Sequence, residues 1–210
     1  MVDIERAEKR TIQYFYSDGL FEIALGLVLL LLGGYFFAET AISEGSAVKK
    51  VLSGLGVLVI VSAGFLIGRF LRFFKRRLTY PRTGYVAYKK DRSPRSRRLA
   101  AIVGAVIGFL FSALIAISPS VRTLLPAING LLFAVALLFF ANKVGLARLF
   151  VLAAASALAG FAVTAAGVGD IKGLGLYYGI FGAAVIVSGL ATLVAYLRKT
   201  RRPGESSDGI

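Results

Sequence analysis

Residues 20–38 read Leu-Phe-Glu-Ile-Ala-Leu-Gly-Leu-Val-Leu-Leu-Leu-Leu-Gly-Gly-Tyr-Phe-Phe-Ala, an apolar run with one charged residue, Glu22. An α-helix needs about 20 predominantly apolar residues to cross the ~30 Å hydrocarbon core of a bilayer. The run is continuously apolar rather than alternating, which favours a helix over a barrel strand. This stretch therefore predicts a transmembrane helix.

Five more segments have the same character. Hydrophobic residues make up 57% of the 210 residues. Charged residues make up 17%, below the roughly 25% of a soluble domain. We therefore expect an all-α fold, a single polytopic membrane bundle over residues 1–210 with six transmembrane helices. The expected spans are about 20–38, 51–70, 99–117, 122–141, 146–166 and 174–197.

The distribution of lysine and arginine predicts the orientation. Of the 25 basic residues, 21 fall on one side of the expected spans. The four on the other side are Lys49, Lys50, Arg122 and Lys172. Because short cytoplasmic loops carry an excess of Lys and Arg, both termini are expected in the cytoplasm. The cytoplasmic segments are an interfacial arm over 1–19, a basic loop over 71–98 and a disordered tail over 203–210.

Composition narrows the chemistry. The chain has no cysteine and no histidine, which removes disulfides, thiolate nucleophiles, Cys/His zinc sites and imidazole acid–base catalysis. We expect no cofactor and no metal ion. The net charge of +14 invites a nucleic-acid partner, but the positive-inside distribution explains it more simply.

Glycines inside the spans predict close helix packing. Small residues let helix backbones approach one another in lipid, where burial of apolar surface gives no driving force. Three G-x-x-x-G pairs fit this pattern, at Gly64/Gly68, Gly104/Gly108 and Gly175/Gly179. We favour packing within one chain over a dedicated dimer face, and an oligomer stays possible.

Charged residues at the cytoplasmic ends of the spans form the first candidate site. Asp18 and Glu22 lie four residues apart, on one face of a helix. Interfacial ion pairs that fix helix packing are the favoured interpretation, and a cation or proton site at the cytoplasmic mouth is the alternative. The members of this cytoplasmic-rim cluster are Asp18, Glu22, Arg69, Arg72, Arg98 and Arg148.

The basic loop is the second candidate site. A helical continuation over 69–78 would place Arg69, Arg72 and Arg76 on one face, and a hairpin-like turn is expected over 80–88. Polybasic segments bind anionic lipid headgroups, and this is the favoured interpretation of the loop. A docking site for a partner protein is the more specific alternative. The candidate contacts are Tyr80, Arg82, Tyr85, Tyr88, Lys89, Lys90, Arg92, Arg95, Arg97 and Arg98.

Two stretches of the first half, Tyr16-Ser17-Asp18-Gly19-Leu20-Phe21-Glu22-Ile23 and Leu78-Thr79-Tyr80-Pro81-Arg82-Thr83-Gly84-Tyr85-Val86, resemble an uncharacterised family of prokaryotic multi-span membrane proteins. The resemblance implies a prokaryotic cytoplasmic (inner) membrane. It brings no activity and no catalytic residue, but it draws attention to Asp18, Glu22 and residues 80–86.

Three classes of function are compatible with these features. The favoured one is a non-catalytic membrane component, an accessory subunit, anchor or sensor whose basic loop contacts anionic lipid or a partner. A small transporter or channel comes second, because the spans contain few polar residues to line a pathway. A lipid-modifying enzyme comes last, because the sequence shows no nucleophile–base pair and no phosphate-binding glycine loop.

Overall fold

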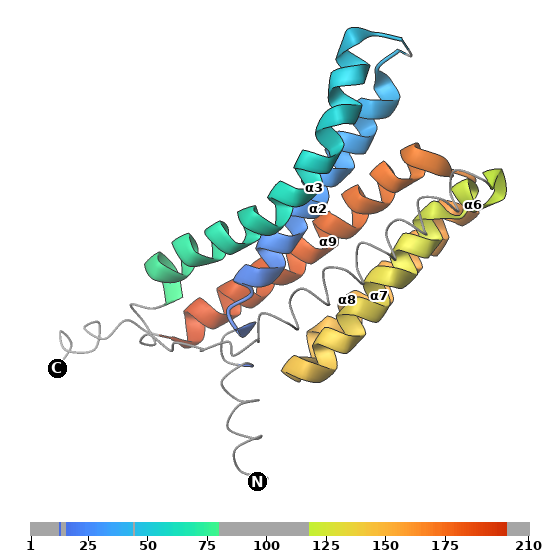
Figure 1. Cartoon of the computed structure of the whole chain (residues 1–210). Helices are drawn as coiled ribbons and strands as arrows, with labels where there is room; N and C mark the ends of the chain where they lie inside the picture. The colour runs from blue at the N-terminus through green and yellow to red at the C-terminus, as the bar shows by residue number, and fades with distance from the viewer. Residues whose placement is uncertain (1–12, 14–15, 44, 80–117, 201–210) are drawn as a thin grey trace, which may run out of the picture.

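The computed structural model describes residues 13, 16–43, 45–79 and 118–200, and every regular element within them is helical (Figure 1). The described part of the chain therefore confirms the all-α prediction. The elements are α2 (Leu20–Ala41), α3 (Ala47–Phe74), the π-helix η1 (Lys75–Thr79), α6 (Pro119–Thr123), α7 (Leu125–Val144), α8 (Ala147–Ala165) and α9 (Asp170–Lys199).

Four of these helices, α2, α7, α8 and α9, are long and apolar enough to cross a membrane. They coincide with the spans expected over 20–38, 122–141, 146–166 and 174–197. The span expected over 51–70 falls within α3, but the side chains of 56–61, 63 and 64 are outside the description. The span expected over 99–117 lies outside the described residues altogether, as do most of the arm and the tail from 201 onward.

Two helices begin at other residues than the expected spans. The segment 122–141 was expected as one helix, but the chain forms the short α6 and then restarts as α7. Pro126 explains the break, since it lacks the N–H that would bond to the carbonyl of Arg122 and is tolerated only in a first helical turn. The last helix begins at Asp170 rather than near residue 174, and its 30 residues exceed the length needed to span a bilayer.

The helices form two closely packed antiparallel pairs, α2 with α9 and α7 with α8, and α3 lies beside α2 (Figure 1). Helix α9 also contacts α7 and α8 and so joins the pairs. The largest fully buried side chains include Tyr177 and Phe181 of α9 and Leu149 of α8. The core therefore lies where α9 meets the α7–α8 pair.

Glycines at every seventh position hold α2 against α9. Gly26 of α2 lies so close to α9 that an added Cβ would be 2.8 Å from the carbonyl oxygen of Gly182. The same occurs one heptad earlier at Gly19, 2.4 Å from the Gly189 oxygen, and one heptad later at Gly33, 3.1 Å from the Gly175 oxygen. A seven-residue repeat keeps one seam facing a partner in left-handed packing. We call these six glycines the glycine seam.

The seam differs from the expected G-x-x-x-G pairs. Gly175 does make a close contact, but an added Cβ on Gly179 or Gly68 would find no described atom within 4 Å. Gly104 and Gly108 lie outside the described residues, and the surroundings of Gly64 are not described. An added Cβ on Gly33 would nevertheless lie 3.0 Å from the Gly179 nitrogen and 3.1 Å from the Gly175 oxygen, so the expected Gly175/Gly179 pair does pack closely against α2. The heptad spacing of the seam was not predicted.

A second close approach and a buried polar cluster join α7, α8 and α9. Gly130 and Gly160 face each other, with an added Cβ on either lying 2.9 Å from the Cα of the other. The Ser156 hydroxyl lies 2.9 Å from the Gly130 carbonyl, to which it donates, and 2.8 Å from the Tyr177 hydroxyl. The Ser156 hydroxyl thus joins three helices by hydrogen bonds, as polar side chains inside membrane helices commonly do.

Candidate functional site

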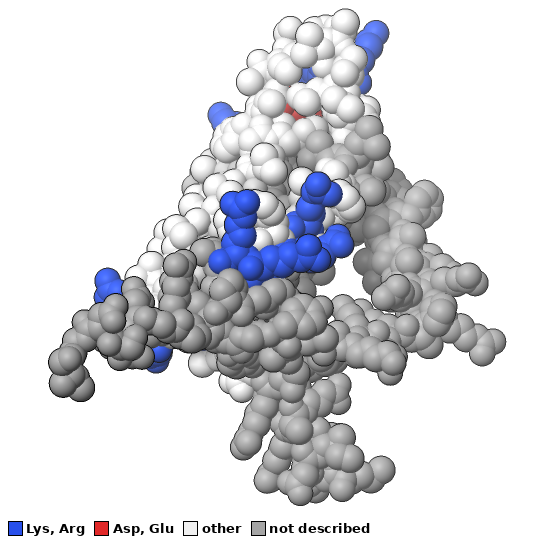
Figure 2. Space-filling view, turned by 90° about the vertical axis from the view of Figure 1, so that its left-hand side faces the viewer, with Lys and Arg blue, Asp and Glu red and all other residues white. Residues whose placement is uncertain are grey.

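One end of the bundle gathers most of the described basic side chains, and Figure 2 shows a cluster of them on one face. We call it the basic end. Three contacts show that the start of α2, the end of α3 and the α7–α8 turn meet there: Asp18 with Lys75, Glu22 with Arg148, and the Gln13 amide donating to the Gly145 carbonyl over 3.2 Å. The basic end carries Arg69, Arg72, Lys75, Arg76, Arg77, Lys143, Arg148, Arg198 and Lys199.

Asp18 joins the start of α2 to the end of α3. Its side chain is 1% exposed, and Oδ1 accepts a hydrogen bond of 3.2 Å from the backbone N–H of Leu20. Oδ2 lies 3.1 Å from Nζ of Lys75, whose side chain is 3% exposed. The carboxylate thus satisfies a free N–H in the first turn of α2 and also neutralises a buried ammonium.

Lys75 was not among the predicted site residues. Burial lowers the pKa of its ammonium below the ordinary value of 10.5, and the charge and hydrogen bond of Asp18 oppose this shift. The sequence distinguishes Lys75 only as the one lysine within the arginine-rich stretch 69–79, which does not indicate a partner.

Glu22 pairs with Arg148 at the start of α8. Nε of Arg148 lies 2.6 Å from Oε1 of Glu22, and the same guanidinium donates from Nη2 to the carbonyl of Tyr16. Glu22 is 3% exposed at its side chain, and among the described residues its Oε2 has no hydrogen-bond partner. One arginine therefore ties α8 to α2 and to Tyr16, four residues before the start of α2, and one carboxylate oxygen of Glu22 is left without a partner among the described residues.

The cytoplasmic-rim cluster is thus two separate ion pairs rather than one group. Arg148 was an expected partner of Glu22 and is found there. Arg69 and Arg72 were also expected as partners, but they form no ion pair within the described residues. They lie on the exposed side of α3, one and two turns before Lys75, which contacts Asp18 instead. Arg98 lies outside the described residues.

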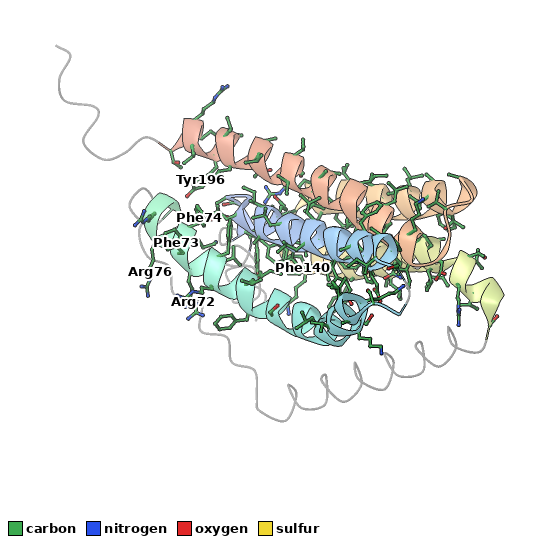
Figure 3. The ribbon with its side chains drawn as sticks, turned by 90° about the horizontal axis from the view of Figure 1, so that it is seen from above. Arg72, Phe73, Phe74, Arg76, Phe140 and Tyr196 are labelled. Atoms are coloured by element: carbon green, nitrogen blue, oxygen red, sulfur yellow. The ribbon has the colours of Figure 1, made fainter. Side chains whose placement is uncertain are left out.

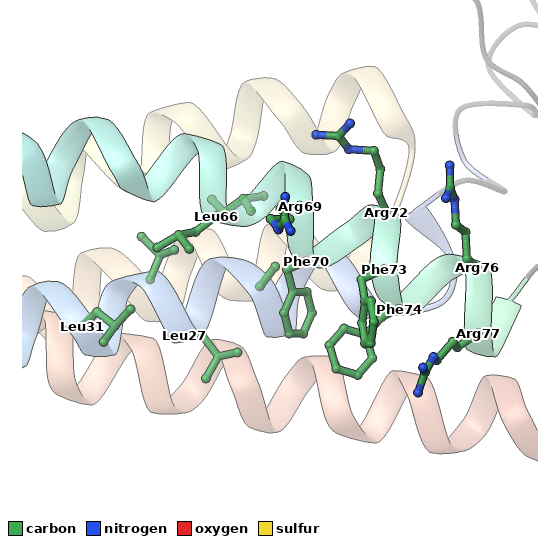
Figure 4. Close-up of a pocket in the computed structure, with 13 residues that line it drawn as sticks. Leu27, Leu31, Leu66, Arg69, Phe70, Arg72, Phe73, Phe74, Arg76 and Arg77 are labelled. Carbon is green, nitrogen blue, oxygen red and sulfur yellow. The ribbon is translucent and has the colours of Figure 1, made fainter.

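Arg69 and Arg72 instead border a groove between α2 and α3. A cavity of about 670 Å³ runs between the two helices, lined on the α2 side by Leu27 and Leu31. In Figure 4, Phe70, Phe73 and Phe74 project from α3 toward α2 and α9, and the arginines lie near them. The lining residues are Ala24, Leu27, Val28, Leu31, Leu66, Ile67, Arg69, Phe70, Arg72, Phe73, Phe74, Arg76 and Arg77.

The arginines of this groove point in two directions. Arg72 and Arg76 project away from the bundle, as Figure 3 shows from above, in agreement with the predicted basic face of a continuing helix. Arg77 lies on the phenylalanine side, with Cζ 4.8 Å from the centre of the Phe73 ring (Figure 4). The groove therefore has an apolar wall and a positively charged end.

A second cavity, of about 500 Å³, continues the groove toward the opposite end of the bundle. It shares Val28, Leu31 and Leu66 with the first and reaches Tyr35 and Ala38 of α2. Together the two cavities follow much of the length of α2 on its α3 side.

The predicted loop contacts lie outside the described residues. The structure ends its description of this segment at Thr79 and resumes at Ser118. The candidate contacts in this range are Tyr80, Arg82, Tyr85, Tyr88, Lys89, Lys90, Arg92, Arg95, Arg97 and Arg98.

Comparison with known proteins adds no family to this description. No protein-family model, curated protein or solved structure matches the chain. Among the described residues, no three Asp or Glu side chains come together as metal ligands. The class that the fold defines is therefore a helical membrane bundle, and the groove with its charged end is the feature that offers a binding site.

Proposed function

We propose that the chain is a six-span, non-catalytic component of a prokaryotic cytoplasmic membrane, an accessory subunit, anchor or sensor that binds anionic lipid at its basic end. The observation that carries the proposal is the run of exposed arginines on the last turns of α3 and on η1, Arg69, Arg72, Arg76 and Arg77. They lead directly into the basic loop. Anionic lipids of the cytoplasmic leaflet attract such segments by roughly 1 kcal/mol per Lys or Arg.

The arrangement of the ends supports the proposed topology. The basic end carries nine described lysines and arginines, whereas Lys49, Lys50, Arg122 and Lys172 belong to the ends of helices on the opposite side. An excess of this kind favours the cytoplasm for the basic end. The chain leaves the described residues at the basic end and returns at the opposite one, which supports a further crossing between Thr79 and Ser118.

Transport receives less support. Asp18 and Glu22 are the buried carboxylates that a proton or cation pathway would use, but neither lines the two cavities described between α2 and α3. The buried Ser156 hydroxyl of α8 is engaged in contacts with α7 and α9. A stable bundle that presents a charged end therefore explains the described residues better than a pathway does.

The test is neutralisation of the basic loop in the full chain. A variant with Arg92, Arg95, Arg97 and Arg98 changed to Gln is purified in mild detergent, and the anionic phospholipid that accompanies it is quantified. We expect most of this lipid to be lost, since four charges at about 1 kcal/mol each are removed. The control is Lys49→Gln/Lys50→Gln at the opposite end. Unchanged lipid content in the loop variant, or equal loss in the control, would refute the proposal.

A further inference from the structure

The side of α2 that faces α3 leaves large apolar side chains uncovered. Leu27 is 40% exposed, Leu31 is 60% exposed, and Leu66 across the groove on α3 is 44% exposed. The seam glycines of α2 lie against α9, so the α3 side has no comparable close approach. The groove has the size of a ligand site, since such sites span roughly 300–1,000 Å³.

The groove has the length of one membrane leaflet. Arg77 follows Leu66 by eleven residues, which at 1.5 Å per residue is about 16 Å along a helix. Half of a ~30 Å hydrocarbon core is about 15 Å. If Arg77 lies at the level of the headgroups, Leu66 and Leu31 therefore lie near the middle of the bilayer, where the acyl chains of one leaflet end.

The charged end of the groove suits a phosphate group. Arg77 is exposed on the phenylalanine side of the groove and forms no ion pair within the described chain, whereas Arg76 projects away from the bundle. Lys75 between α3 and α2 is neutralised by Asp18, so the positive charge available to a ligand is that of the arginines. A guanidinium binds phosphate through paired hydrogen bonds and stacks on an aromatic ring, as Arg77 does on Phe73.

From this juxtaposition we infer that the groove between α2 and α3 binds one anionic phospholipid, with an acyl chain against Leu27, Leu31 and Leu66 and the phosphate at Arg77. The inference rests on the proposed function and deepens it, because it names the ligand class and a site for a single molecule. A soluble phosphate would use only the charged end. A zwitterionic lipid would gain less from four arginines than a lipid with net negative charge.

The first experiment measures lipid retention by native mass spectrometry. The full-length protein is extracted in mild detergent from vesicles of phosphatidylglycerol and phosphatidylcholine. We expect one phosphatidylglycerol to stay bound to each chain. Leu31→Trp, which fills the groove, should abolish this retention, and Arg77→Gln should lower it about fivefold, corresponding to the roughly 1 kcal/mol of one basic residue. The matched controls are Leu158→Trp on the exposed face of α8 and Arg198→Gln at the end of α9, and both should retain the lipid.

The second experiment identifies the occupant. A photoreactive phenylalanine at position 31 should label phosphatidylglycerol. Labelling of peptide 99–117 or of a second copy of the chain instead would overturn the inference. Lipid retention by Leu31→Trp equal to that of the unaltered protein would overturn it as well. If that occurs while the variant neutralised at 92–98 loses its anionic lipid, the groove is refuted and the proposed function stands; if both variants keep their lipid, both are refuted.

Discussion

Helix α2 meets its two neighbours in opposite ways. Toward α9 it presents glycines at heptad spacing, and backbone lies against backbone, with an added Cβ on Gly26 meeting the Gly182 oxygen at 2.8 Å. Toward α3 it presents Leu27 and Leu31, and a groove of about 670 Å³ separates the helices. Both faces are apolar. Residue size, rather than hydrophobicity, therefore decides which face closes and which stays open.

The difference reflects the physics of helix association in lipid. Lipid tails are as apolar as leucine, so a leucine face gains little by leaving lipid, whereas a glycine face gains dispersion contacts when backbones meet. The closed side of α2 can thus stabilise the fold, and the open side is free to accept a ligand. Glu22, which pairs with Arg148, lies on the closed side with its Cβ next to Gly189, and the exposed Arg69 lies on the open side. The second ion pair, between Asp18 and Lys75, instead joins α2 to the α3 side at the basic end.

The largest expected effect is on the closed side. Arg148→Met should lower the free energy of unfolding by about 3 kcal/mol, because removing one partner leaves the buried Glu22 without its counterion. Unfolding followed by circular dichroism in mixed detergent provides the measurement. Arg69→Met on the open side is the matched control and should change stability by less than about 0.5 kcal/mol. Equal effects of the two substitutions would break the contrast between the two sides.

The glycine seam gives the next largest effect. Gly26→Ala should destabilise the protein by about 1–3 kcal/mol, because the methyl group would overlap the backbone of α9. Gly34→Ala, in the same helix but with no described atom within 4 Å of an added methyl, should be neutral or slightly stabilising. The same unfolding measurement compares them. A seam that accepted alanine without loss would show that backbone contact does not hold α2 to α9.

The smallest effect concerns the ion pair of Asp18 with Lys75, which joins the start of α2 to the end of α3. Because burial lowers the pKa of Lys75, the unfolded chain binds this proton more tightly than the folded chain does. Stability should therefore rise as the pH increases through the interval between the folded pKa and 10.5, by at most about 1.4 kcal/mol per pH unit. Unfolding free energies between pH 8 and 11 test this. Asp18→Asn/Lys75→Met should lack the slope, and a slope that persists in this variant would assign the dependence to another group.

The sequence predicted which charged residues make up much of the site, but it did not predict which of them form ion pairs with one another. Asp18, Glu22 and Arg148 stood out because ionisable residues close to a span are costly and seldom placed without partners. Which arginine meets which carboxylate depends on helix rotation and on neighbours more than a hundred residues away, as for Glu22 and Arg148. Lys75 was not predicted because five other basic residues lie near it in the sequence and look equivalent. Only its position around the axis of α3 brings it to Asp18.

The sequence by itself determined that this protein is helical and apolar enough to lie in a membrane, because each such helix satisfies its own backbone hydrogen bonds and depends only on local composition. It also determined the positive end, since charge asymmetry is a property of loops. Only the tertiary structure decided that α2 pairs with α9 across most of the chain, and that its other face borders a groove. Both features depend on the register between helices that are distant in sequence. The fit of glycine against the backbone of the neighbouring helix fixes this register, and the sequence of one helix alone does not encode it.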